Sequence, residues 1–96
     1  MNEVIFKKLK VNLDTKSCFL LEEEINLTKT EYNLLVFFLE NKDKIYTRKE
    51  IMKSVWDSEV SLRAVDTTIS RLRKKLKEMG KYIATKPGFG YWFNTK

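Results

Sequence analysis

The most regular pattern of apolar positions in this chain lies between residues 62 and 79 and is closed by Gly80. The apolar residues recur at steps of four, three, four and three: Val65, Ile69, Leu72, Leu76 and Met79. This spacing places them in one stripe along an α-helix. The sequence therefore predicts a long amphipathic helix over residues 62–79.

The face opposite this stripe is polar and largely cationic. It presents Arg63, Thr67, Ser70 and Lys74, flanked by Asp66, Arg71, Arg73 and Lys77. Short polar side chains can approach base edges while long cations reach phosphates. A helix spanning roughly 25 Å fits a DNA major groove about 12 Å wide, which favours a recognition helix. The alternative is an ordinary solvated helix, since this composition suits any exposed helix.

Upstream, residues 4–27 alternate short apolar runs with polar clusters that are typical of turns. The apolar runs are residues 4–6, 9–13, 18–21 and 25–27, and the turns are expected at residues 14–17 and 22–24. Leu9, Val11 and Leu13 share one face at the period of two that a half-buried strand requires. We expect a small antiparallel sheet of three or four strands.

Two capping boxes mark helix starts in the middle of the chain. At residues 28–31 and again at 47–50, a threonine is followed three residues later by a glutamate, and this pair satisfies free amides of a first helical turn. The first helix continues to about Glu40 and is apolar nearly all round, which predicts a core helix buried on both sides. The second is short, with a buried side made by Ile51, Met52, Val55 and Trp56.

The short helix, a connection at residues 57–61 and the long basic helix follow the order of a helix-turn-helix. The connection exceeds the usual three or four residues, which favours a variant of the motif. The final segment, residues 81–93, predicts a β-hairpin, because Pro87 and Gly88 suit the central positions of a type II turn. A hairpin directly after a recognition helix is a wing. The alternative is a structural hairpin whose aromatic residues close the core.

The formal net charge of +6 is unevenly distributed. Residues 1–48 contain eight Lys or Arg and eight Asp or Glu, whereas residues 49–96 contain eleven against five. The positive field belongs to the half with the long helix, which indicates a polyanionic partner such as nucleic acid. A membrane surface is the weaker option, because the apolar residues of that helix are needed in the core.

The composition of the chain argues against several classes of protein. At 96 residues, 43% of them hydrophobic and 33% charged, the chain fits one globular domain over residues 1–96. It contains neither an apolar run of about 18 residues nor a signal-peptide pattern, so we expect a cytoplasmic protein. Cys18 is the only cysteine, and a buried inert thiol is favoured over a redox switch. With no histidine, metal-ligand cluster, phosphate loop or nucleophile beside a base, we expect no enzyme activity, metal or cofactor.

Five stretches together form a specific pattern: residues 27–35, 46–52, 55–56, 63–76 and 85–93. The most specific are Arg-x-Val-Asp-x-x-Ile-x-x-Leu-Arg-Lys-x-Leu from residue 63 and Gly-x-Gly-Tyr from residue 88. Over residues 3–94 the chain resembles the OmpR/PhoB-type winged-helix domain, the DNA-binding effector of bacterial two-component response regulators. The resemblance implies an α+β winged helix-turn-helix with a four-stranded antiparallel sheet (1–27), three helices (28–79) and a hairpin wing (81–94).

The resemblance also implies where DNA is contacted. The third helix, residues 62–79, would enter the major groove, and the wing would lie on the adjacent backbone or minor groove. The positions at which the family touches DNA correspond to Arg63, Asp66, Thr67, Thr68, Ser70, Arg71, Arg73, Lys74 and Thr85. Arg71 is the best candidate for a base contact.

Two departures from the family pattern change these expectations. Ser70 stands where many members have arginine, so one phosphate contact is missing or shifted. Pro87 occupies a wing position that is often arginine, so we expect Lys86 to supply a phosphate contact instead.

Further partners follow from the resemblance. Residues 57–61 correspond to the family's transactivation loop, so Asp57 and Glu59 are candidate contacts to RNA polymerase, with a plain solvated loop as the alternative. The family commonly binds direct repeats in double-stranded DNA as tandem dimers, which implies a second copy of the chain. Its members also carry a phosphorylated receiver domain; the 96 residues are used by the effector fold, so this is either an excised domain or a protein without a receiver.

A winged helix that contacts only other proteins is the main alternative to DNA binding. It would require an apolar patch on the outer face of the long helix. The residues expected on that face are polar or cationic, which favours DNA.

Overall fold

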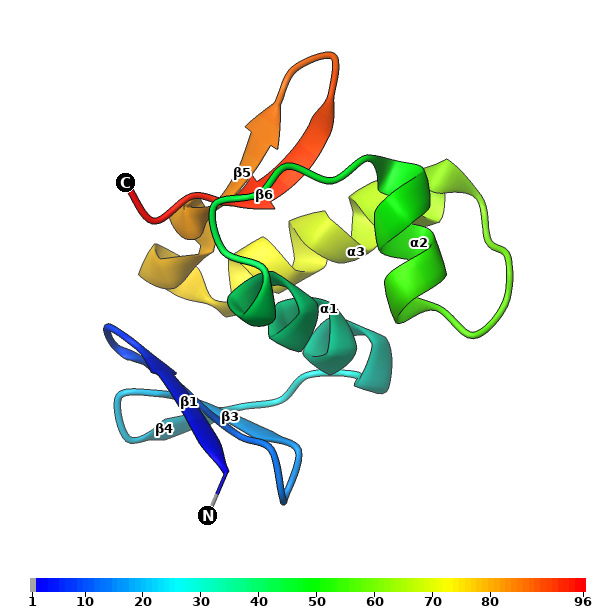
Figure 1. The fold of residues 1–96 in the computed structure, drawn as a ribbon. Coiled ribbons are helices and arrows are strands. Elements are labelled where there is room, and N and C mark those ends of the chain that lie inside the picture. The colour runs from blue at the N-terminus through cyan, green and yellow to red at the C-terminus, as the bar shows by residue number, and fades with distance from the viewer. Residues whose placement is uncertain (1) are drawn as a thin grey trace.

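The computed structural model describes residues 2–96, so only Met1 of the predicted domain lies outside the described residues (Figure 1). The α+β class and the predicted order of elements are confirmed. The elements are β1 (Glu3–Phe6), β2 (Leu9–Asn12), β3 (Ser17–Leu20), β4 (Glu23–Ile25), α1 (Lys29–Glu40), α2 (Arg48–Val55), α3 (Leu62–Lys75), the 3-10 helix η1 (Lys77–Tyr82), β5 (Ile83–Lys86) and β6 (Gly90–Phe93).

The first four strands form one antiparallel sheet in the order β1-β2-β3-β4. Leu9 pairs with Leu20 and Val11 with Cys18, and all four side chains are buried. Burial raises the pKa of the Cys18 thiol to about 11, so the thiolate is not formed at neutral pH. The expected burial of this cysteine is therefore confirmed.

Two strand limits differ from the prediction. Leu21 was expected to end a strand, but its φ is 58° and it makes the turn before β4 instead. The sheet consequently resumes at Glu23, so β4 is shifted from the predicted residues 25–27. The apolar pattern placed Leu21 in a strand because leucine is usually a core residue, but this leucine is 63% exposed.

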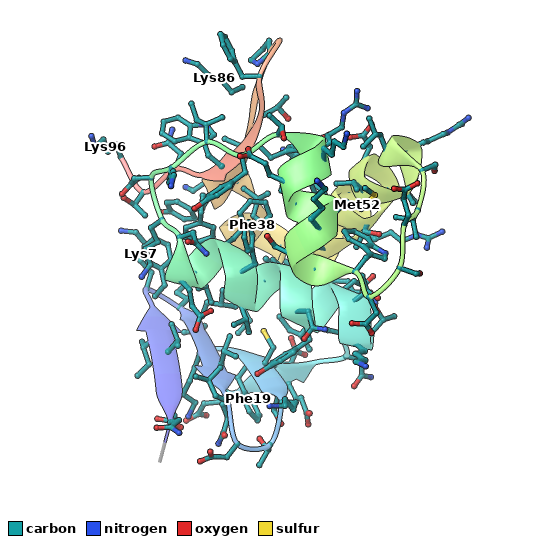
Figure 2. The ribbon with its side chains drawn as sticks, turned by 45° about the vertical axis from the view of Figure 1, so that its right-hand side comes forward. Lys7, Phe19, Phe38, Met52, Lys86 and Lys96 are labelled. Atoms are coloured by element: carbon teal, nitrogen blue, oxygen red, sulfur yellow. The ribbon has the colours of Figure 1, made fainter. Side chains whose placement is uncertain are left out.

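Helix α1 lies between the sheet and the other helices (Figure 1). Leu34, Leu35 and Phe38 are fully buried, and Phe38 lies in the interior of the molecule in Figure 2. The expected burial of this helix on two sides is confirmed.

No helix within residues 2–96 is long and apolar enough to cross a membrane.

Both predicted capping boxes are present. The Glu31 amide donates to Thr28 Oγ1 (3.1 Å) and Glu31 Oε1 accepts from the Thr28 amide (2.9 Å). Thr47 and Glu50 make the same pair of bonds, at 3.1 and 2.8 Å. Ser61 caps α3 through its hydroxyl. These local bonds define where all three helices begin.

The long helix is shorter than predicted. Helix α3 ends at Lys75 rather than at residue 79, and Lys77 takes a left-handed φ of 54° at the start of η1. The side chains of Leu76 and Met79 are nevertheless buried. The apolar stripe thus continues through the change of helix type, which is why the spacing did not reveal the end of α3.

Gly80 gives a physical reason for this turn. A side chain at position 80 would overlap the backbone carbonyl of Arg73. The chain therefore folds back closely onto the end of α3 before it enters the hairpin, and an uninterrupted α-helix would not bring these two positions together.

Strands β5 and β6 form the predicted hairpin, which projects from the helices (Figure 1). The Phe89 amide donates to the Lys86 carbonyl at 2.9 Å and Gly88 has a φ of 83°, as a type II turn requires. At the base of the hairpin Phe93 is fully buried. The hairpin thus both closes the core and carries an exposed tip.

Candidate nucleic-acid interface

Helix α3 presents a polar outer face because its inner face is anchored in the core. Val65, Ile69 and Leu72 are fully buried. Five of the residues predicted to contact DNA are exposed: Arg63, Thr67, Ser70, Arg71 and Lys74. The single exposed large apolar residue of α3 is Leu62. The outer face therefore lacks the apolar patch that a protein-contact surface would require.

The cations of this face are free of acidic partners. Within residues 2–96, no carboxylate forms an ion pair with Arg63, Arg71 or Lys74. Exposed cations without partners keep their charge available for an anion.

Within the same residues, no group of three or more His, Cys, Asp or Glu side chains could hold a metal ion.

Three other predicted residues of α3 are half-buried and already bonded within the protein. The Thr68 hydroxyl donates to the Ala64 carbonyl at 2.8 Å. Asp66 accepts from Arg48 Nη1 (3.0 Å) through Oδ2 and from the Tyr91 hydroxyl (2.7 Å) through Oδ1. Both carboxylate oxygens of Asp66 are thus occupied by groups from α2 and β6.

Arg73 connects α3 to the wing. Its Nε donates to the Ile83 carbonyl (2.7 Å) and its Nη2 donates to Thr85 Oγ1 (2.9 Å). Its guanidinium carbon lies 5.5 Å from the centroid of the Tyr91 ring, a cation–π distance. The structure thereby brings together Arg73 and Thr85, which the sequence had placed in separate elements.

The environment of Tyr91 keeps its hydroxyl protonated. Burial, followed by the hydrogen bond and the negative charge of Asp66, raises the Tyr91 pKa, against the smaller opposing effect of Arg73 and Arg48. The tyrosine is therefore the donor in its bond to Asp66. Sequence reasoning assigned no functional role to Arg48 and placed Tyr91 only in the core. No local pattern signals their contacts with Asp66, which span 18 and 25 residues.

Beyond this contact the wing stands away from the helices. An open cavity of about 330 Å³ lies between the N-terminal end of α2 and the hairpin, lined by Arg48, Asp66 and residues 85–91. Lys86 lies near the far end of the hairpin in Figure 2 and is exposed. Phe89, in the same turn, is 68% exposed. The tip of the wing thus presents a cation and an aromatic ring to solvent.

The connection between α2 and α3 is also exposed. Asp57 lies 3.9 Å from Lys29, but both side chains are largely in solvent, so this ion pair is weak. Glu59 is exposed as well. Both carboxylates predicted to contact RNA polymerase are accessible.

Comparison with known sequences gives consistent matches. Residues 22–93 match the family model described as "Transcriptional regulatory protein, C terminal". The transcriptional regulatory protein SrrA of Staphylococcus aureus is 37% identical over 97 residues, which cover 95% of this chain and 40% of SrrA. The chain therefore spans less than half the length of the curated relatives it matches.

Solved structures share the fold over almost the whole chain. The DNA-binding domain of the response regulator AdeR, crystallised in complex with an intercistronic region, has a TM-score of 0.85 and 34% identity, over 94% of this chain and 97% of that one. The response regulator DrrB of Thermotoga maritima, described as an OmpR/PhoB homolog, has a TM-score of 0.86 and 36% identity, over 96% of this chain and 44% of DrrB.

Proposed function

Because this chain belongs to the family of C-terminal domains of transcriptional regulatory proteins, the OmpR/PhoB-type winged-helix effector domains, we propose that it binds double-stranded DNA sequence-specifically as part of a bacterial two-component transcriptional regulator. The family is one of regulators and not of enzymes. Helix α3 enters the major groove, and the wing lies on the adjacent backbone or minor groove. The main support for this proposal is the exposed outer face of α3, whose cations have no acidic partner within residues 2–96.

The contacts divide by side-chain chemistry. Arg71 is exposed in the middle of α3, and its guanidinium can donate two parallel hydrogen bonds to guanine. Arg63 and Lys74 reach phosphates, while the short hydroxyls of Thr67 and Ser70 permit close approach to the bases. On the wing, Thr85 and Lys86 take phosphate contacts, with the Thr85 hydroxyl oriented by Arg73.

Other partners extend this proposal. Membership of the response-regulator family implies a receiver domain as a partner of this domain, and DNA with direct repeats would align two copies of the chain. Asp57 and Glu59 would contact RNA polymerase. Since bacterial DNA and its polymerase share one compartment, the proposed site of action is the cytoplasm.

The direct test is selection of bound sequences from a random duplex pool, followed by titration of the selected and a scrambled duplex at two salt concentrations. The proposal expects a direct repeat with half-sites about one helical turn apart, bound at least about 10³-fold more tightly than the scramble. Equal, salt-sensitive affinity for both duplexes would contradict sequence-specific binding. Absence of binding at low salt would favour the protein-contact alternative.

Arg71→Ala is expected to weaken binding to the selected duplex by about 1 to 3 kcal/mol. The same change should relax the preference at one base pair, because the lost hydrogen bonds read that pair. Titration against a panel of single-base substitutions measures both effects. An equal loss on selected and scrambled duplexes would make Arg71 a phosphate contact only.

Lys74→Ala is expected to weaken binding to every duplex alike and to lower the slope of log K against log salt by about 0.9. The reason is that a phosphate contact releases counterions whatever the sequence. Lys53→Ala is the matched control, because Lys53 is exposed on α2, outside the proposed contacts. A loss confined to the selected duplex would reassign Lys74 to base recognition.

A further inference from the structure

The carboxylate of Asp66 joins three elements at the base of the wing. It projects from α3, accepts from Arg48 of α2 at 3.0 Å and accepts from Tyr91 of β6 at 2.7 Å. Charge-assisted hydrogen bonds of this kind are directional and stronger than neutral ones. With both oxygens already accepting hydrogen bonds, Asp66 is a poor acceptor for a base, and its negative charge opposes a phosphate.

A second contact lies on the other side of Tyr91. The Arg73 guanidinium carbon lies over the ring, 5.5 Å from its centroid, and Arg73 Nη2 donates to Thr85 Oγ1 at 2.9 Å. Tyr91 therefore uses its hydroxyl toward Asp66 and its ring toward Arg73. The result is a continuous network, Arg48–Asp66–Tyr91–Arg73–Thr85, which we call the wing-base network.

Further support for the hairpin also lies at its base, in the backbone bridge between Tyr46 and Tyr91 and in the buried Phe93. The cavity of about 330 Å³ separates its inner edge from Arg48 and Asp66, and the tip residues 86–89 are all exposed. A hairpin held only at its base changes the position of its tip when the base rotates. The wing-base network is therefore placed to control where Lys86 lies relative to α3.

We propose that Asp66, Tyr91 and Arg73 are positioning residues that hold the wing at the angle at which α3 and the wing contact DNA simultaneously. This inference rests on the proposed function and deepens it. Asp66 and Arg73 then act within the protein, while Arg63, Arg71 and Lys74 act on DNA. Tyr91 determines the spacing between the two sets of contacts without touching the duplex.

Tyr91→Phe tests this role, because it removes the hydroxyl and keeps the ring under Arg73. Tyr46→Phe is the matched control, since the Tyr46 hydroxyl bonds Asn41 Oδ1 (3.0 Å), outside the wing-base network. Both variants are compared with the wild-type chain in urea unfolding, in titration of the selected duplex at several salt concentrations, and in hydroxyl-radical footprints. Lys86→Ala is added to each background to form a double-mutant cycle.

The expected result is that Tyr91→Phe unfolds cooperatively but binds the selected duplex about tenfold more weakly, as for loss of one hydrogen bond to a charged group. Its footprint should lose the wing-side protection and retain the protection under α3. Lys86→Ala should weaken binding in the wild-type and Tyr46→Phe backgrounds, yet cause no further loss in Tyr91→Phe, because the wing contact is already lost.

Three results would overturn the inference while leaving DNA binding intact: Tyr91→Phe binding as tightly as Tyr46→Phe, protection lost equally under α3 and the wing, or a full additional loss from Lys86→Ala. If the wild-type chain binds no duplex even at low salt, the proposed function is wrong and this inference fails with it. The wild-type titration therefore separates the two failures.

Discussion

Gly90→Ala is expected to lower the free energy of unfolding by about 4 kcal/mol, through backbone strain and overpacking together. Gly90 has a φ of 153°, which side-chain-bearing residues rarely adopt. A methyl group there would also overlap the Tyr46 carbonyl oxygen. That oxygen accepts a hydrogen bond from the Tyr91 amide at 3.0 Å. In return, the Tyr46 amide donates to the Tyr91 carbonyl at 2.9 Å, and the two bonds form a backbone bridge. The substitution thus separates the wing from the loop before α2.

Gly88→Ala in the same hairpin is the matched control. Gly88 also has a positive φ, 83°, but nothing lies within 4 Å of the position a methyl would take. Only backbone strain of about 1 kcal/mol is expected. Urea unfolding of the two variants measures the difference. Equal destabilisation would show that the approach to Tyr46 is unimportant and that only the glycine backbone matters.

Lys75→Met is expected to lower the free energy of unfolding by about 2 kcal/mol at neutral pH. This is less than the roughly 3 to 5 kcal/mol typical of breaking a fully buried ion pair, because the Lys75 side chain is 37% exposed. Its ammonium lies 2.6 Å from Glu31 Oε1, and the Glu31 side chain is only 4% exposed. The pair joins the end of α3 to the start of α1. Methionine preserves the packing of the stem but leaves a buried carboxylate without its cation.

The same variant should change the response to acid. In the wild type, burial raises the Glu31 pKa, but Lys75 and the bonds to Thr28 together hold it below its usual 4.5. A lowered folded pKa contributes stability above the unfolded value, and this contribution is lost as the pH falls through the folded value. In Lys75→Met the effect of burial remains while that of Lys75 is removed, so the loss on acidification should shrink.

Lys8→Met is the control for both effects. Lys8 pairs with Glu78 at 3.1 Å, but the two side chains are 49% and 58% exposed, so its removal should cost less than about 1 kcal/mol. Urea unfolding at neutral pH and at several acidic pH values gives both comparisons. Equal stability of the two variants at neutral pH, or unchanged acid sensitivity of Lys75→Met, would contradict the proposed strength of the Glu31 pair.

Much of the fold was readable from local sequence because the interactions responsible are local. Thr28 and Thr47 cap helices through glutamates three residues away. Pro87 and Gly88 define a turn within four residues. The apolar stripe of Val65, Ile69 and Leu72 correctly identified which face of α3 is buried, and thereby which face is exposed.

The predicted limits of helices and strands were wrong where contacts or backbone conformation that the apolar pattern does not show determine them. The end of α3 was placed four residues too late, because Leu76 and Met79 remain buried after the helix type changes. That change depends on Gly80 packing against Arg73. Leu21 was placed in a strand because an apolar residue does not reveal that its backbone is left-handed.

The sequence by itself determined the order of the elements, the starts of the first two helices, the buried face of α3 and its cationic outer face, since these depend on spacing and composition within a few residues. Only the tertiary structure decided which predicted contact residues are free to meet DNA. Arg71 and Lys74 remain exposed, whereas Asp66 and Arg73 are bonded to Arg48, Tyr91 and the wing. The reason is physical: a polar side chain on a helix face binds whichever partner the fold brings within hydrogen-bonding distance, and those partners lie 10 to 25 residues away in the chain.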